Sequence, residues 1–138
     1  MRESLLNLLD EWQDRLGLQD WAIVLRTNCS NDDLISEDAE NQSGEVEWTL
    51  QCKSAIIRLK SFDDINQFII PTDYEKTLVH ELLHLKFALI QVMCQTELEH
   101  EHMHQLLNDM ARAMVDSKHG RTGRKLSCAR FKDMVVKN

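Results

Sequence analysis

Apolar residues recur at helical spacing in three stretches of the chain. Residues 3–16 carry leucines and a tryptophan at intervals of three and four, and Gly17 follows where a left-handed C-cap would fall, so an amphipathic helix is expected here. Residues 71–93 are apolar on two sides and are expected to form one helix buried nearly all round. A third helix is expected from Thr96, its cap, to about Asp116. Its core side is expected at Met103, Leu107, Met110 and Met114.

The helix at residues 71–93 has a marked start. Thr72 and Glu75 are spaced as a capping box, and Asp73 adds negative charge to the first turn. Two apolar stripes run along this helix: Leu78, Leu82, Leu85 and Leu89, and Val79, Leu83, Phe87 and Ile90. Only a short connection separates it from the third helix, which predicts that the two helices are antiparallel neighbours.

Between the first and second helices the spacing becomes that of strands. Trp21–Cys29 is a β-branched and apolar run that suits a first strand. Residues 30–43 are polar and acidic, and a loop with room for a short helical turn is expected there. Glu45–Leu50 alternates polar with apolar residues and Ala55–Leu59 is a short apolar run, so two antiparallel strands joined at about residues 51–54 are expected. The pattern as a whole predicts an α+β fold.

The length of 138 residues suits one hydrophobic core and is too short for two ordinary domains. We therefore expect a single domain at residues 1–117, followed by a tail at 118–138. The N-terminus has acidic residues where a signal peptide needs an apolar run, and no stretch of 18 apolar residues occurs, which predicts a cytoplasmic protein with no membrane segment. The four cysteines are scattered without a C-x-x-C pair, which argues against a cysteine-based zinc site or redox motif.

Charge is unevenly distributed along the chain. Residues 118–138 hold seven Lys or Arg against Asp133 alone, a net charge of +6, so residues 1–117 carry −13 of the total of −7. Such a basic tail can make weak contact with nucleic acid, but it can equally stay in solvent or dock on its own acidic domain.

The sequence from His80 to His84, H-E-L-L-H, is an H-E-x-x-H motif inside the second helix. Residues four apart lie on one helix face, so the imidazoles of His80 and His84 can meet at a single zinc ion. Glu81 lies beside them, where its carboxylate can take a proton from water at the metal instead of binding the ion. Burying these three groups among apolar residues would be costly unless they are hydrogen-bonded or bound to a cation. The motif therefore predicts a zinc site.

The segments L-G-L-Q-D-W, G-E-V-E-W, A-I-I-R-L, T-L-V-H-E-L-L-H-L-K-F and L-L-N-D-M-A-R-A-M together resemble the small zincin-like metallopeptidases of phages and bacteria, over residues 15–115. The chain is similar to the minigluzincins and, more loosely, to SprT-like proteins. The resemblance implies a minimal zincin fold: an N-terminal helix, a small, mostly antiparallel three-stranded sheet, the motif helix beneath it and a following helix with the third zinc ligand. It also implies that Ala55–Leu59 is the edge strand on which an extended peptide adds.

The third ligand is expected on the helix after the motif. In the resembling families it is a glutamate, whereas here that helix begins with three glutamates and three histidines in eight residues. Alignment of the helix end with the family's apolar pattern puts His104 at the glutamate position. Helical period favours His104 or His100, because both lie beside the stripe of Met103 and Leu107. Glu97, Glu99 and Glu101 remain alternatives.

These residues predict a zinc-dependent metallopeptidase. His80, His84 and His104 would hold Zn²⁺ with a fourth position open. Glu81 would act as the general base and then pass the proton to the leaving amine of a peptide or protein substrate. Tyr74 could donate to the oxyanion, although an ordinary place at the helix start is the favoured interpretation. Two other interpretations stay open: a non-catalytic regulatory module that zinc stabilises, and a nucleic-acid-associated protein that acts through its tail.

Overall fold

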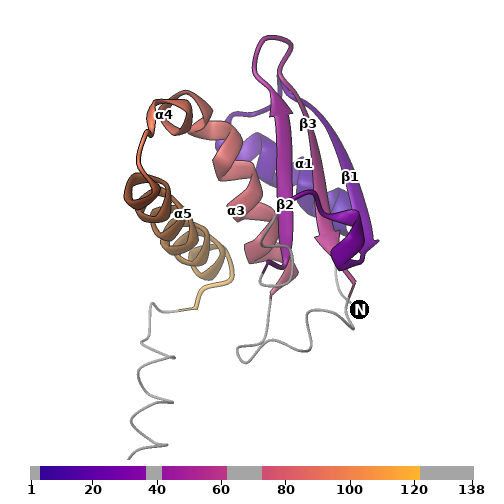
Figure 1. Cartoon of the computed structure of the whole chain (residues 1–138). Helices are drawn as coiled ribbons and strands as arrows, with labels where there is room; N and C mark the ends of the chain where they lie inside the picture. The colour runs from indigo at the N-terminus through magenta and orange to yellow at the C-terminus, as the bar shows by residue number, and fades with distance from the viewer. Residues whose placement is uncertain (1–3, 37–41, 62–72, 122–138) are drawn as a thin grey trace, which may run out of the picture.

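The computed structural model describes residues 4–36, 42–61 and 73–121, and these form an α+β fold (Figure 1). Its elements in chain order are α1 (Leu5–Leu16), β1 (Ala22–Cys29), the 3₁₀ turn η1 (Asn31–Asp33), β2 (Gly44–Thr49), β3 (Ser54–Lys60), α3 (Tyr74–Lys86), α4 (Ala88–Met93) and α5 (Glu97–Lys118). The expected first helix, first strand and hairpin are confirmed. Gly17 ends α1 with φ of 69°, in the left-handed conformation that glycine adopts without strain.

The three strands form one sheet in the order β1-β3-β2. Strand β2 pairs with β3 in antiparallel fashion, as expected, but β1 pairs with β3 in parallel, so the expectation of a mostly antiparallel sheet is wrong. A long connection follows Cys29, and β2 is separated from β1 in the sheet by the width of one strand. Strand β3, the last of the three in the chain, lies between β1 and β2. Ala55–Leu59 is therefore central and the expectation that it is an edge strand is wrong. The edges are β1 and β2.

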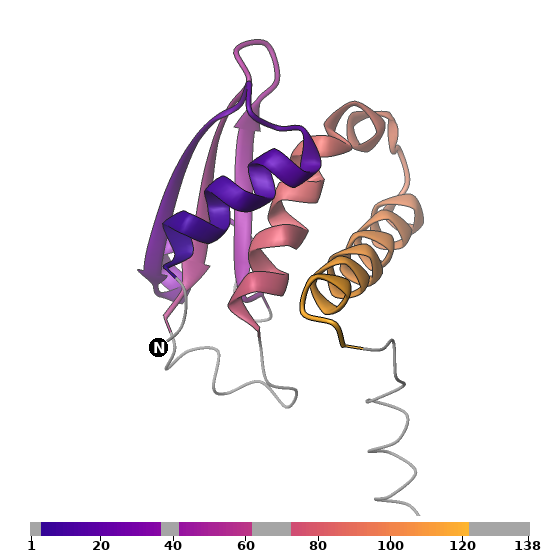
Figure 2. The ribbon, with the colours of Figure 1, turned by 180° about the vertical axis from the view of Figure 1, so that it is seen from behind.

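Helices α1 and α3 pack on the same face of the sheet, and α5 packs against α3 (Figure 2). The core contains fully buried residues from β3, α3 and α5, among them Ile57, Leu59, Leu78, Leu82, Leu83, Leu107 and Val115. The start of α3 contacts the end of α5, where Lys76 Nζ lies 3.2 Å from Asp116 Oδ1. The two helices therefore run antiparallel, as expected. Among the described residues, no helix is both long and apolar enough to cross a membrane.

The start of α3 differs from the expected capping box. Its N-cap is Asp73, whose side chain accepts hydrogen bonds from the backbone N–H groups of Glu75 and Lys76. Thr72, the expected cap, lies outside the described residues. The Glu75 side chain turns inward instead and accepts a hydrogen bond from Trp12 Nε1 at 2.8 Å. By contrast, the expected cap of α5 is confirmed, because Thr96 forms a complete capping box with Glu99.

The expected single helix over residues 71–93 is broken at Phe87 into α3 and α4. All but one of the residues from Leu78 to Leu85 are buried, because the sheet, α1 and α5 cover α3. In α4 only Ala88 is buried, and Leu89 and Ile90 are 65% and 50% exposed. Burial nearly all round is therefore correct for α3 and wrong for α4, which extends past the elements that cover α3.

The side of α5 that faces the core is turned relative to the expected methionine stripe. Its buried residues are Leu107, Ala111 and Val115, and Met103, Met110 and Met114 are only partly buried beside them. Leu107 belongs to both sets. His104 lies one turn before Leu107, so the side of α5 that carries the buried residues also brings His104 toward α3.

Candidate metal centre

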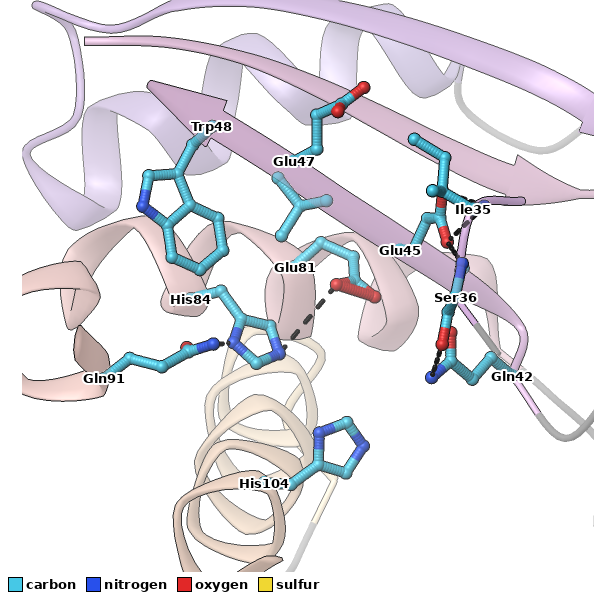
Figure 3. A pocket seen from close by; sticks show the side chains of 12 residues that line it. Ile35, Ser36, Gln42, Glu45, Glu47, Trp48, Glu81, His84, Gln91 and His104 are labelled. Carbon is cyan, nitrogen blue, oxygen red and sulfur yellow. Dashed lines mark hydrogen bonds and ion pairs between the residues drawn. The ribbon is translucent and has the colours of Figure 1, made fainter. Parts of the chain in front are cut away.

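Three histidines from two helices converge beside β2. His80 and His84 lie one turn apart on α3, with their Nε2 atoms 3.2 Å apart. His104 reaches them from α5, with its ring centroid 4.6 Å from that of His80 and 5.8 Å from that of His84. One nitrogen from each ring lies within 4.8 Å of the others. Figure 3 shows the His104 ring directed from α5 toward the side of α3 that carries His84 and Glu81.

The spacing of the His80 and His84 nitrogens fits a zinc ion. Zinc bound by imidazoles at 2.0–2.1 Å in a tetrahedron separates two ligand nitrogens by about 3.3 Å. The distance of 3.2 Å between His80 and His84 matches this value. His104 is exposed, so its side chain has room to close the remaining distance. Among the described residues, the buried side-chain polar atom without a hydrogen-bond partner is His80 Nδ1, the ring nitrogen that does not face His84.

The other candidates for a third ligand do not join this group. His100, Glu97, Glu99 and Glu101 are all exposed. The Glu99 carboxylate is engaged at the helix start, where it accepts a hydrogen bond from the Thr96 backbone N–H at 2.9 Å. Of the residues that sequence analysis left open, the structure thus brings only His104 to the H-E-x-x-H histidines within the described part of the chain.

All three imidazoles are held in the form that binds metals. Burial, with some repulsion from His84 and His104, lowers the pKa of His80 to about 3. Burial also lowers the pKa of His84 and that of His104 below their ordinary values. The rings are therefore neutral at pH 7, and each offers a nitrogen lone pair.

Glu81 lies beside the histidines in a nearly dry position. It is 4% exposed, and its Oε1 lies 4.0 Å from His84 Nε2. Burial, reinforced by the negative charge of Glu45, raises the pKa of Glu81 to about 8. A cation at the histidines would favour the ionised carboxylate and lower this pKa. A buried carboxylate beside three histidines, with a pKa near neutral pH, has the properties of a general base.

A pocket with a volume of about 380 Å³ opens over these residues. Strand β2 forms one wall, and Glu81, His84, Gln91 and His104 line the opposite side (Figure 3). The Trp48 ring stacks on His84 with a centroid distance of 6.3 Å and an interplanar angle of 22°. The edge strand at the pocket is therefore β2, and not the run Ala55–Leu59 that sequence analysis assigned to this position.

Sequence analysis missed two residues of this site, Gln91 and Trp48. Gln91 Oε1 lies 2.7 Å from His84 Nδ1. The signal for Gln91 was its position as the one polar residue in the run A-L-I-Q-V-M that forms α4. Tyr74 lies elsewhere, since its hydroxyl donates to the backbone carbonyl of Lys60 at 2.9 Å and it does not line the pocket. It has an ordinary place at the start of α3.

The described part of the basic tail is bound to the domain. Lys118, the last residue of α5, donates to Glu75 Oε2 at 2.6 Å and to Glu11 Oε1 at 2.9 Å. Arg121 Nε lies 3.4 Å from Asp116 Oδ1. Acidic groups of the domain thus partner both described basic residues of the expected tail.

Comparison of the chain with protein-family models, with curated proteins and with solved structures finds no match. The class of protein must therefore be inferred from the α+β fold and from the chemistry of the histidine site.

Proposed function

We propose that the protein is a zinc-dependent metallopeptidase with a minimal zincin fold. The observation that carries this proposal is the convergence of three neutral imidazoles, His80, His84 and His104, beside the buried carboxylate of Glu81 at one wall of an open pocket. This is the ligand number of a catalytic zinc site, with a residue of suitable chemistry for a general base next to it.

The chain's own residues would divide the reaction between them. A bound zinc ion would polarise the substrate carbonyl and acidify water near it. Glu81 would take the proton from that water and return it to the leaving amine. An extended substrate would pair with the outer edge of β2, which no described strand pairs with, since the other edge of β2 is paired with β3. The pocket between β2 and the histidines is where such a strand would lie.

A purely structural zinc site is the second candidate, and the geometry favours it less. Structural sites are closed by four protein ligands. Here the group of metal-binding side chains in the described residues has three members, and His84 and His104 line a pocket that solvent can enter. The remaining alternative, nucleic-acid binding by the tail, gains no support from Lys118 and Arg121, whose charges pair with acidic groups of the domain.

Zinc binding by single-histidine variants tests the proposal. We expect about one zinc per chain in the wild type, no zinc in His80→Ala or His84→Ala, and an affinity lower by orders of magnitude in His104→Ala. His100→Ala is the matched control, because His100 is an exposed histidine one turn earlier on the same helix. Metal content by elemental analysis and affinity by chelator competition give the result. Wild-type protein without zinc, or unchanged affinity in His104→Ala, would overturn the proposed ligand set.

A further inference from the structure

Gln91 contacts the site from a separate helix. It belongs to α4, and its Oε1 lies 2.7 Å from His84 Nδ1. The two residues are seven apart, which corresponds to about 10.5 Å along a straight helix. The helix breaks at Phe87, and α4 turns away from the direction of α3 (Figure 1). The side chains of His84 and Gln91 are in direct contact across this turn.

The contact determines which ring nitrogen of His84 carries the proton. The Gln91 carbonyl oxygen can only accept, so His84 Nδ1 is the donor. A neutral imidazole with its proton on Nδ1 has its lone pair on Nε2. That atom is the one that faces His80 Nε2 at 3.2 Å. The hydrogen bond thus directs the free lone pair of His84 to the place where the three histidines converge.

We propose that Gln91 is a positioning residue that fixes the tautomer and the ring plane of His84 for metal binding. Trp48 stacks on the face of the same ring, so the imidazole is held at its face by β2 and at its edge by α4. The inference about zinc affinity rests on the proposed function, whereas the inference about the tautomer concerns the metal-free protein. Such outer partners of a metal-binding histidine typically change metal affinity by about 10–100-fold.

A neutral acceptor suits this position. Glu81 is buried beside His84, and the nearby Glu45 already raises the pKa of Glu81. A carboxylate at position 91 would add a further negative charge, whereas the glutamine amide orients the ring without adding charge. The acidic groups of the pocket are then Glu45, Glu47 and Glu81 alone among the described residues that line it.

Two variants and one control isolate the hydrogen bond. Gln91→Met removes the acceptor while keeping length and helix propensity, and Gln91→Glu keeps an acceptor. Gln105→Met makes the same chemical change at an exposed position of α5 that does not line the pocket. The measurements are ¹⁵N NMR of the imidazoles in metal-free protein, with His84 assigned by its loss in His84→Ala, zinc affinity by chelator competition, and thermal unfolding of each metal-free variant.

We expect His84 to carry its proton on Nδ1 in the wild type and to shift toward the Nε2-protonated form in Gln91→Met. Zinc affinity should fall about 10–100-fold in Gln91→Met, recover in Gln91→Glu and stay unchanged in Gln105→Met. An Nε2-protonated His84 in the wild type, or wild-type affinity in Gln91→Met, would overturn the inference. If Gln91→Met fails to fold, the tautomer of His84 in the wild type and the zinc affinity of Gln91→Glu test the inference instead. Wild-type protein that binds no zinc would instead refute the proposed function, and the metal-free spectrum would still decide the role of Gln91.

Discussion

Replacing Glu75 by glutamine tests how much the hydrogen bonds between Glu75 and the end of α5 stabilise the domain. Glu75 is 8% exposed on α3 and accepts hydrogen bonds from Trp12 of α1, from Lys118 at the end of α5 and from His119 just beyond it. These contacts join three helices at the end of α5 away from His104. The substitution Glu75→Gln keeps the size of the side chain and removes its charge.

The size of the effect follows from the pKa of Glu75. Burial opposes ionisation, but the hydrogen bonds from Lys118, His119 and Trp12 outweigh it and lower the pKa from 4.5 to about 2. This difference corresponds to about 3 kcal/mol of stability. His119 is 42% exposed, so solvent screening weakens its share, and we expect Glu75→Gln to lose about 2 kcal/mol at pH 7.

Urea unfolding of metal-free wild type and Glu75→Gln between pH 7 and pH 3 measures this contribution. Because the folded-state pKa is depressed, the stabilisation is complete above about pH 5 and is lost as pH falls from 4.5 toward 2. The difference between the two proteins should therefore shrink to less than half by pH 3. Glu11→Gln is a control that removes a more exposed partner of Lys118 and should cost less. A difference that stays constant from pH 7 to pH 3 would refute the role assigned to the Glu75 charge.

Three further substitutions test the packing around the site by urea unfolding. Gly44→Ala should cost about 1–3 kcal/mol, because a Cβ there would lie 2.9 Å from the backbone oxygen of Arg58, and wild-type stability would contradict this close approach. Leu107→Ala should cost about 2–5 kcal/mol, since Leu107 is fully buried between α5 and α3, and a loss below about 1 kcal/mol would contradict that burial. Thr96→Ala should cost about 1 kcal/mol through the lost cap of α5 and leave zinc affinity unchanged, so a large fall in affinity would contradict the separation of cap and site.

Features that depend on neighbouring residues were predictable from the sequence. The capping box at Thr96, the glycine that ends α1 and the hairpin of β2 and β3 each follow from residues within a few positions of one another. The pairing of His80 with His84 is of the same kind, because helix geometry alone places residues four apart on one face.

Features set by distant packing were not predictable in this way. No Pro or Gly marks the break at Phe87, and α4 leaves the core only because the elements that bury α3 do not extend over it. The parallel pairing of β1 with β3 depends on the path of a long connection. The contact between His84 and Gln91 depends on that break, so a pattern read as one continuous helix gave no reason to join them.

The position of His104 depends both on neighbouring residues in the sequence and on the packing of distant elements. Sequence analysis favoured His104 but left His100 and three glutamates at the start of α5 as alternatives. The rotation of α5 then decides among them, and that rotation is set by the packing of Leu107, Ala111 and Val115 rather than by the methionines.

Cleavage of peptides by wild type and Glu81→Gln is the most direct test of the proposed metallopeptidase activity. The substitution keeps the shape of a side chain that is 4% exposed and removes the proposed general base, so zinc content and unfolding temperature should stay close to those of the wild type. Digestion of a peptide library, read by mass spectrometry with a chelator control, should show cleavage by the wild type that falls at least ~10²-fold in Glu81→Gln and disappears with the chelator. Absence of cleavage by zinc-loaded wild type, or equal cleavage by wild type and Glu81→Gln, would contradict the proposal.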